Sequence, residues 1–360
     1  MNRWPRANAF FWFLLFCGLL EIGARVFLTP EGMVSLDRNE TQLRNWPEYL
    51  AGNEDHNNLM VYLSNSQAVG LEIKDSSSIY PSLLRDKLRL EHPDLWLENW
   101  SVSGLSAEHI ELLTIKAAQR NAKTLVLAVS MINFDSLRNY QFTSDVTDIQ
   151  LLVGIPSAWH ALTNTFMGSY LSWEDKLSRL FLMISHAARG KIVALDLLAE
   201  MMPSKWHRTA FGQIRNQDAL KTIRQMAPDE IDMAQENVQK LTNPMSASMW
   251  KKSFQLSNAP RLQAVYEHLR VRLIDHGIKL VWIWTPVGRN EDNLAAVQGQ
   301  QDIIDAHCQR VIEDGWACED LSQALDASFF IPSIFSSHLT PQGHQAEAAL
   351  IYPILNNALH

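Results

Sequence analysis

The sequence predicts a three-layer α/β/α fold with a mainly parallel β-sheet. Two observations predict it: short continuous apolar runs, typical of strands buried on both faces, and longer segments of helical periodicity between them. Strands and helices that alternate at this spacing favour a sheet covered by helices on both sides. The 360 residues supply enough material for the core of one large domain or two ordinary ones.

The predicted elements follow one another along the chain. We expect strands at 59–63, 95–100, 124–130 and 279–285, and a weaker one at 315–321. We expect helices at 81–92, 106–120, 259–277, 299–315 and 340–359. Residues 150–258 contain no convincing strand and predict a helical insertion. This insertion either packs onto the sheet domain or has a function of its own, as a cap over a site or as a surface for the membrane or a partner.

The N-terminal segment predicts a membrane anchor at residues 1–28. An apolar stretch from residue 7 to residue 28 follows Arg3 and Arg6, and a helix of this length spans ~33 Å, about the hydrocarbon thickness of a bilayer. A cleaved signal peptide is the alternative, but "GLLEIGA" is a poor cleavage site. The basic residues ahead of the helix predict a cytoplasmic N-terminus. The remaining segments are a juxtamembrane linker at 29–58 and an exported domain at 59–360.

The composition argues against several classes of protein. Apolar residues make up 47% of the chain and charged residues 19%, which is typical of a globular protein. A net charge of −8 argues against a nucleic-acid partner, since neutralising phosphates needs clustered Lys and Arg. We find no phosphate loop and no metal-site spacing, so we expect neither a metal nor a cofactor. Cys308 and Cys318 form either a disulfide or two unpaired buried thiols.

Four residues suited to acyl chemistry lie at the ends of predicted elements. Ser66 follows the first strand, Gly104 the second and Asn133 the third, and His338 precedes the last helix. Catalysis by a serine needs a hydroxyl, a base for its proton and donors for the oxyanion. In a parallel sheet such groups meet at the carboxyl edge of the strands. Each residue alone has an ordinary explanation as a turn, a cap or a satisfied polar group, but together their order favours an active site.

This order resembles the SGNH (GDSL-type) hydrolases, which are named for a serine, a glycine, an asparagine and a histidine in four blocks. The matching stretches are "SNS" (64–66), "NWSVSG" (99–104), "MINF" (131–134) and "SHLTPQG" (337–343). The resemblance covers roughly residues 59–133 and 279–355, and it implies a flavodoxin-like sandwich with ester or acyl-transfer chemistry. It also implies roles for the four residues: Ser66 as nucleophile, His338 as general base, and Gly104 and Asn133 as oxyanion donors.

The blocks depart from the family's pattern in three places. The first block reads Ser-Asn-Ser rather than Gly-Asp-Ser, and the third reads Met-Ile-Asn-Phe rather than Gly-x-Asn-Asp. The family's acid, three residues before the histidine, is Phe335 here. Such a carboxylate holds the tautomer of the histidine and stabilises the imidazolium. Ser336, a main-chain carbonyl or Asp326 is left to orient His338, and a serine–histidine dyad and a degenerate site both stay open.

The anchor "FWFLLFCGLLEIGARVFL" followed by "LSNSQ" resembles a membrane-tethered subgroup of SGNH-like proteins. These accompany membrane-bound O-acyltransferases in alginate or peptidoglycan O-acetylation and teichoic acid D-alanylation. The resemblance implies a bacterial inner-membrane protein with a periplasmic domain, a membrane-bound O-acyltransferase as partner and a carbohydrate acceptor. The competing hypothesis is a catalytically degenerate scaffold for that partner, and a third is an exported lipase-like enzyme.

Overall fold

The described part of the chain forms a parallel sheet. A computed structural model describes residues 4–27, 57–70, 73, 75–102, 105–134, 173–185, 259–288, 299–331 and 338–359. Its five-stranded sheet has the order β2-β1-β3-β4-β5, and every neighbouring pair is parallel. The strands are β1 (Leu59–Ser64), β2 (Trp96–Asn99), β3 (Thr124–Val129), β4 (Lys279–Trp284) and β5 (Ala317–Asp320). All the predicted strands are confirmed, including the weaker one.

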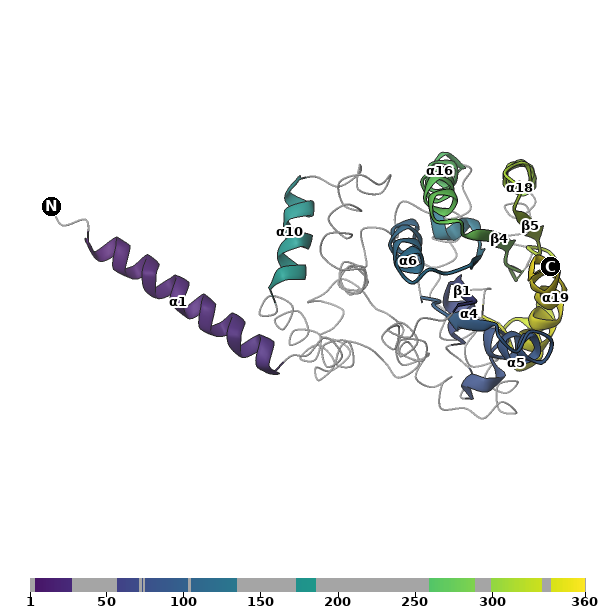
Figure 1. The fold of residues 1–360 in the computed structure, drawn as a ribbon, viewed down its shortest axis with the longest axis horizontal. Coiled ribbons are helices and arrows are strands. Elements are labelled where there is room, and N and C mark those ends of the chain that lie inside the picture. The colour runs from purple at the N-terminus through teal and green to yellow at the C-terminus, as the bar shows by residue number, and fades with distance from the viewer. Residues whose placement is uncertain are drawn as a thin grey trace.

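Helices cover both faces of this sheet (Figure 1). One face carries α5 (Tyr80–Glu91) and α19 (Pro341–Leu359), and the other carries α6 (Ala107–Gln119), α16 (Ala259–His276) and α18 (Gln301–Glu313). The predicted three-layer architecture is therefore confirmed. The short elements are α4 (Ser66–Val69), η1 (Ser76–Ser78), η2 (Met131–Phe134) and η6 (Ala327–Phe329).

The strand order decides where a site would lie. It is the order of flavodoxin-like doubly wound sheets, in which the direction of winding reverses between β1 and β3. Ligands of such sheets bind outside the carboxyl ends of the strands, beside this reversal. The segments that follow β1 and β3 are therefore the first place to look for function.

The inner strands β1, β3 and β4 are mainly apolar because the sheet is covered on both faces. Along β1, Leu59, Val61 and Leu63 pack toward α6, α16 and α18, whereas Met60 and Tyr62 pack toward α5 and α19. Every residue of β1 and of β3 is buried. Successive side chains of a strand point to opposite faces, so a strand with a helix layer on each side reads as a continuous apolar run.

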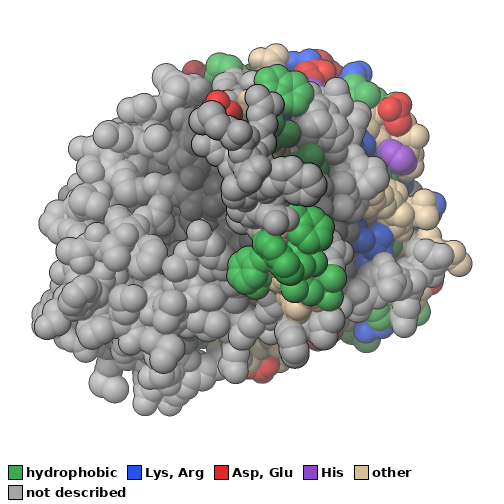
Figure 2. Space-filling model, turned by 90° about the vertical axis from the view of Figure 1, so that its left-hand side faces the viewer, with side chains coloured by type: hydrophobic (Ala, Val, Ile, Leu, Met, Phe, Trp, Pro, Cys, Tyr) green, Lys and Arg blue, Asp and Glu red, His purple; other side chains and the backbone are tan. Residues whose placement is uncertain are grey.

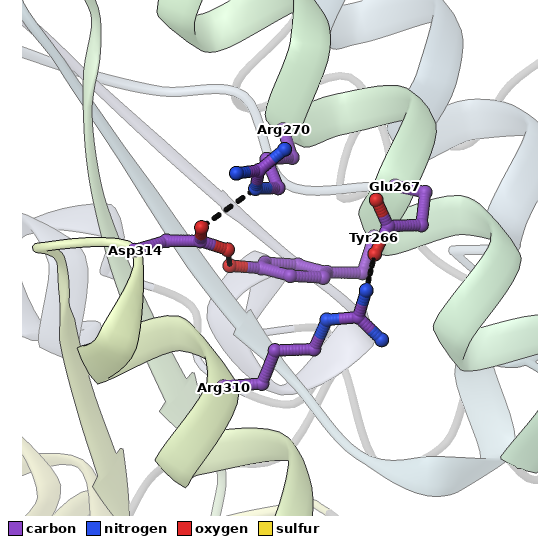
Figure 3. Close-up of polar contacts among 5 residues, drawn as sticks. All are labelled: Tyr266, Glu267, Arg270, Arg310 and Asp314. Carbon is purple, nitrogen blue, oxygen red and sulfur yellow. Dashed lines mark hydrogen bonds and ion pairs between the residues drawn. The ribbon is translucent and has the colours of Figure 1, made fainter.

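A polar cluster joins α16 to α18 (Figure 3). Asp314, directly after α18, accepts hydrogen bonds from the Tyr266 hydroxyl and from Arg270 Nε, both at 2.7 Å. Arg310 of α18 also forms an ion pair with Glu267 of α16. Burial and the hydrogen bond to Asp314 raise the pKa of Tyr266, so this hydroxyl stays a neutral donor at physiological pH.

Cys308 and Cys318 form a disulfide between α18 and β5. Their Cα atoms lie 5.2 Å apart, which is within the usual range for a bonded pair. Of the two alternatives that the sequence leaves open, the structure therefore contains the disulfide.

A buried ion pair lies at the other end of the sheet, beside β2. Arg120, at the end of α6, contacts Glu98 Oε2 at 2.6 Å, and both side chains are almost fully buried. The indole N–H groups of Trp96 and Trp100 donate to the two oxygens of the same carboxylate. Because Glu98 is paired and hydrogen-bonded on both oxygens, its charge is compensated inside the fold.

Two further helices expose large apolar side chains. These helices are α1 (Trp4–Phe27) and α10 (Trp173–Ile184), and Ser185 beside α10 donates a 2.8 Å hydrogen bond to Glu21 of α1. The exposed residues are Phe11, Trp12, Leu15, Phe16, Leu19, Leu20 and Ile22 on α1 and Trp173, Leu177 and Phe181 on α10. Figure 2 views the side of the molecule where these helices lie in Figure 1, and it shows hydrophobic side chains gathered there.

The predicted anchor and insertion are described only in part. A helix occupies the predicted anchor segment, but in the described ranges no helix is both long and apolar enough to cross a membrane. α10 is a helix inside the predicted insertion at 150–258. The rest of that insertion and nearly all of the 29–58 linker lie outside the described residues.

Candidate functional site

Ser66 lies at a tight junction between β1 and α4. The strand ends at Ser64, Asn65 adopts an extended backbone as the N-cap, and Ser66 is the first helical residue. The Asn65 side chain accepts a 3.0 Å hydrogen bond from the Gln67 backbone N–H, which is the usual way an asparagine starts a helix. Ser66 is half-buried between buried neighbours, and its hydroxyl has no hydrogen-bond partner among the described residues. The fold thus presents this hydroxyl at the carboxyl edge of the sheet.

Asn133 connects the segments that follow three strands. It is fully buried, its Oδ1 accepts from the Ser130 backbone N–H at 2.8 Å, and Asn65 Nδ2 lies 3.4 Å from the same oxygen. Its own Nδ2 donates to the Leu105 carbonyl at 2.9 Å. An amide nitrogen carries two hydrogens, so the predicted oxyanion contact would have to use the second. The bonds present in the structure make Asn133 a residue that holds the site together.

Gly104 lies outside the described residues, but the structure places its flanks. The Val102 backbone N–H donates to the Ser64 carbonyl at 2.9 Å. Leu105 is held by the Asn133 amide. The two described residues on either side of Gly104 are therefore bonded to the end of β1, through Ser64, and to the segment after β3, through Asn133.

His338 lies at the base of a loop directly before α19 and is almost fully buried. Its carbonyl accepts from the Ile331 backbone N–H at 2.8 Å, and Phe330 and Leu339 form an antiparallel bridge that closes the loop. The Thr340 hydroxyl accepts from the Gly343 N–H at 3.0 Å, which confirms the predicted start of the last helix.

Of the side chains expected to orient His338, only Asp326 lies among the described residues. Phe335 and Ser336 lie outside the described residues. Asp326 is exposed at the start of η6, and its carboxylate makes no hydrogen bond to a described residue. The hypothesis that Asp326 orients His338 therefore has no support in the geometry.

Ser66 and His338 belong to segments that meet. Within the described ranges no hydrogen bond joins the two residues directly. However, α4 ends at Gly70, and a Cβ built on Gly70 would lie 3.8 Å from Cε1 of His344, in the first turns of α19. The helix that begins with Ser66 and the helix that follows His338 are thus neighbours.

Sequence reasoning missed two residues that hold α4 in place. Gln67 Nε2 donates to the Pro286 carbonyl, just after β4, at 3.1 Å. Asn99, the last residue of β2, donates from Nδ2 to the Ala68 carbonyl at 3.2 Å. Their only signal in the sequence was a polar side chain at a predicted strand end or beside the candidate serine.

A buried polar cluster lies under the Ser66 turn, on the α5 and α19 side of the sheet. We call it the Tyr80 cluster; its members are Tyr62, Ser64, Tyr80, His344 and Glu347, none of which is exposed to solvent. Burial raises the pKa of the Glu347 carboxyl well above its usual value, which favours its neutral form. Burial and the neighbouring Glu347 likewise raise the pKa of the Tyr62 hydroxyl.

The comparisons with known proteins add no family to this picture. No protein-family model matches the chain, and no curated protein matches it. In the part of the chain that the structure describes, no group of three or more His, Cys, Asp or Glu side chains is placed to hold a metal ion. The chemistry of the site is therefore argued from its own residues, which offer a hydroxyl, an imidazole in a neighbouring segment and amide donors.

Proposed function

We propose that the chain is an SGNH-like acyltransferase or esterase in which Ser66 is the nucleophile and His338 the general base. The observation that carries this proposal is the placement of Ser66. Its hydroxyl is accessible and has no hydrogen-bond partner among the described residues. It lies on a strand-to-helix turn at the carboxyl edge of the sheet. Asn133 ties this turn to the loop that bears Gly104. An ordinary surface turn would not need these buried connections.

The proposed reaction has two steps. His338 takes the proton from Ser66 Oγ, which attacks the carbonyl carbon of an acyl ester, and the N–H groups of Ser66, Gly104 and Asn133 hold the oxyanion. The imidazolium then gives its proton to the leaving oxygen, and an acyl-serine is left. In the second step His338 deprotonates a carbohydrate hydroxyl, whose oxygen attacks the acyl-serine carbonyl. The bond to Ser66 Oγ then breaks, and the imidazolium returns its proton to Ser66 Oγ. Water in place of the carbohydrate gives hydrolysis.

We further propose that the domain faces the periplasm from an N-terminal anchor in a bacterial inner membrane. Arg3 and Arg6, which precede the apolar stretch of α1, and the apolar side chains exposed along this helix support an anchor with a cytoplasmic N-terminus. The Cys308–Cys318 disulfide supports an oxidising compartment for the domain. A membrane-bound O-acyltransferase would supply the acyl group, and the acceptor would be an envelope or exported polysaccharide.

The alternative is a degenerate SGNH-like scaffold for such a partner. Two observations favour it: Phe335 stands where a catalytic acid is expected, and Asn133 is fully buried with its amide already bonded. A scaffold would need the shape of the site without a reactive serine.

The test is covalent capture of the acyl group. Full-length chain in detergent is incubated with an activated acetyl ester, and intact mass reports the adduct. The proposal expects a single acetyl group on the wild type and none on Ser66→Ala or His338→Ala. Ser76→Ala is the matched control, because Ser76 is an exposed serine outside the site.

The outcome decides between the two functions. An adduct that survives in Ser66→Ala would mean that another group reacts, and the proposed nucleophile would be wrong. A folded wild type that forms no adduct, alone or with a membrane-bound O-acyltransferase, would favour the scaffold.

A further inference from the structure

The Tyr80 cluster lies between the two segments that carry the proposed nucleophile and base, and the proposed mechanism uses none of its groups. Ser64 ends β1, two residues before Ser66. His344 belongs to α19, which begins at Pro341, three residues after His338. The cluster therefore includes a residue from the segment before Ser66 and a residue from the helix after His338.

Tyr80 makes contacts to both segments. Its hydroxyl donates to Ser64 Oγ at 3.3 Å and accepts from the Tyr62 hydroxyl at 3.4 Å. Its backbone N–H donates to His344 Nδ1 at 3.2 Å. The two rings also stack, with centroids 5.8 Å apart and planes inclined by 25°. One residue at the start of α5 thus holds the end of β1 with its hydroxyl and the first turns of α19 with its backbone and ring.

The C-terminal end of α4 packs against Ile79, the residue before Tyr80. Gly70 closes α4 with φ +62°, and a Cβ there would lie 2.2 Å from Cγ2 of Ile79. Ile79 immediately precedes Tyr80. The turn that carries Ser66 is therefore held at Ser64 by the Tyr80 hydroxyl and at Gly70 by close packing on Ile79.

The hydrogen bonds that Tyr80 makes join uncharged groups: hydroxyls, a backbone N–H and a ring nitrogen. Burial raises the pKa of the Glu347 carboxyl well above its usual value, and in the described part of the chain neither of its oxygens has a hydrogen-bond partner. Burial, Tyr62 and Glu347 also raise the pKa of Tyr80 well above its usual value, so that the phenol stays a donor. Neutral hydrogen bonds depend steeply on distance and angle, so this cluster sets geometry rather than electrostatic potential.

We propose that Tyr80 is a positioning residue for Ser66, because it couples the end of β1 to the segment of α19 that follows His338. The proposal rests on the proposed roles of Ser66 and His338. Tyr80 makes no hydrogen bond to either residue and acts through Ser64 and His344. Loss of its hydroxyl should let the Ser66 turn shift relative to His338 while the ring preserves the packing.

The first test removes only that hydroxyl. Acylation of Ser66 by the activated acetyl ester is followed by intact mass in the full-length chain and in Tyr80→Phe. We expect the maximal acylation rate to fall about tenfold with an unchanged half-saturating ester concentration, since the loss concerns alignment rather than ester binding. Tyr352→Phe is the matched control, because it removes a hydroxyl that bonds Glu91 on the outside of the same α5–α19 pair. Equal rates in the wild type and Tyr80→Phe overturn the proposal.

A double-mutant cycle separates positioning from general loss of stability. Ser64→Ala removes the partner of the same hydrogen bond, so it should slow acylation by a similar factor. The double variant should be no slower than either single variant, and thermal unfolding should show all of them folded at the assay temperature. Losses that multiply would mean that the two residues act independently, which contradicts the coupling.

Failure of the inference can be told from failure of the proposed function. A folded wild type that forms no Ser66 adduct, alone or with a membrane-bound O-acyltransferase, refutes the acyl chemistry whatever Tyr80 does. The anchoring is then measured by amide hydrogen exchange of the peptide that covers residues 64–70. If this peptide exchanges faster in Tyr80→Phe than in Tyr352→Phe, Tyr80 still anchors the Ser66 turn. Equal exchange in the two variants would show that Tyr80 does not anchor the turn.

Discussion

Asn133 shows how much of this site depends on single buried side chains. One amide holds the Asn65 cap, the backbone of Ser130 and the carbonyl of Leu105. Its removal would leave buried polar groups unsatisfied on three loops, at about 1–3 kcal/mol each. The same residue that the sequence nominates as an oxyanion donor is thus also the support of the other donors.

His307 is a second residue whose burial has a measurable effect. Its ring lies in an aromatic surrounding, with centroids 4.3 Å from Trp282 and 5.0 Å from Tyr266. Burial, assisted by the nearby charge of Arg310, lowers the pKa of His307 to about 3. The folded protein therefore keeps this imidazole neutral under conditions in which an unfolded chain would charge it.

We expect this residue to make stability fall as the pH is lowered. The unfolded pKa is about 6.5 and the folded pKa lies below it, so the contribution is fully present above pH 6.5 and is lost progressively toward pH 3. At pH 5 the loss should be about 2 kcal/mol. Urea unfolding at pH 7.5 and pH 5 should show a smaller decline in His307→Phe than in the wild type.

The control for that measurement is His276→Gln, which alters an exposed histidine at the end of α16. It should show the pH dependence of the wild type. An equal decline in the wild type and His307→Phe would contradict the assignment of the effect to His307.

At the scale of secondary structure, the two ends of α4 determine where the Ser66 turn lies. α4 has only four residues and ends in a left-handed glycine whose missing side chain leaves room for Ile79. A helix this short has little stability of its own. Its two ends are fixed by the cap at Asn65 and by the contact at Gly70, in addition to the hydrogen bonds of Gln67 and Asn99.

Two glycines with the same backbone allow this contact to be tested. Gly70 and Gly277 have φ values of +62° and +63°, but a Cβ on Gly277 would meet nothing within 4 Å. Gly277→Ala should cost about 1–2 kcal/mol, the penalty for a left-handed alanine. Gly70→Ala should cost more, because Ile79 must also move. Chemical unfolding measures both.

The two glycine variants also test whether the end of α4 affects the reactivity of Ser66. We expect Gly70→Ala to slow acylation of Ser66 and Gly277→Ala to leave it unchanged. Equal costs in stability together with equal acylation rates would show that the end of α4 is not constrained by Ile79.

These elements also show what the sequence can and cannot predict. Buried parallel strands produce continuous apolar runs, so β1, β3 and β4 were predicted to within a few residues. The edge strands β2 and β5 and the longer helices were also predicted to within a few residues, although both edge strands contain acidic residues. Ser66 could be nominated because a polar cluster ends an apolar run. Tyr80 could not, because its partner His344 is 264 residues away and only the packing of α5 on α19 brings them together. The link from Gln67 to Pro286 spans 219 residues and is hidden for the same reason.

At the scale of the whole molecule, α1 exposes seven large apolar side chains, whereas each described helix that covers the sheet exposes two at most. If this helix anchors the chain, full-length protein should stay with the membrane fraction after an alkaline carbonate wash. Leu15→Arg, a charge in the apolar stretch, should shift the protein toward the soluble fraction. Leu90→Arg changes a leucine that is 84% exposed on α5 and should have no effect. The same distribution for both variants would contradict an anchor at α1.

The two edges of the sheet have a consequence for the chain before it is fully folded. An open strand edge is a template on which the strand of another copy can add, and β2 and β5, each four residues long, are short edges of the kind that limits such addition. β2 is also held by the buried pair of Glu98 and Arg120, which forms as soon as α6 docks. β5 is tied to α18 by a bond that exists only after two thiols have been oxidised. Aggregation through the β5 edge should therefore be a hazard of the interval between synthesis and oxidation, and a host that oxidises thiols should yield more soluble protein than one that keeps them reduced.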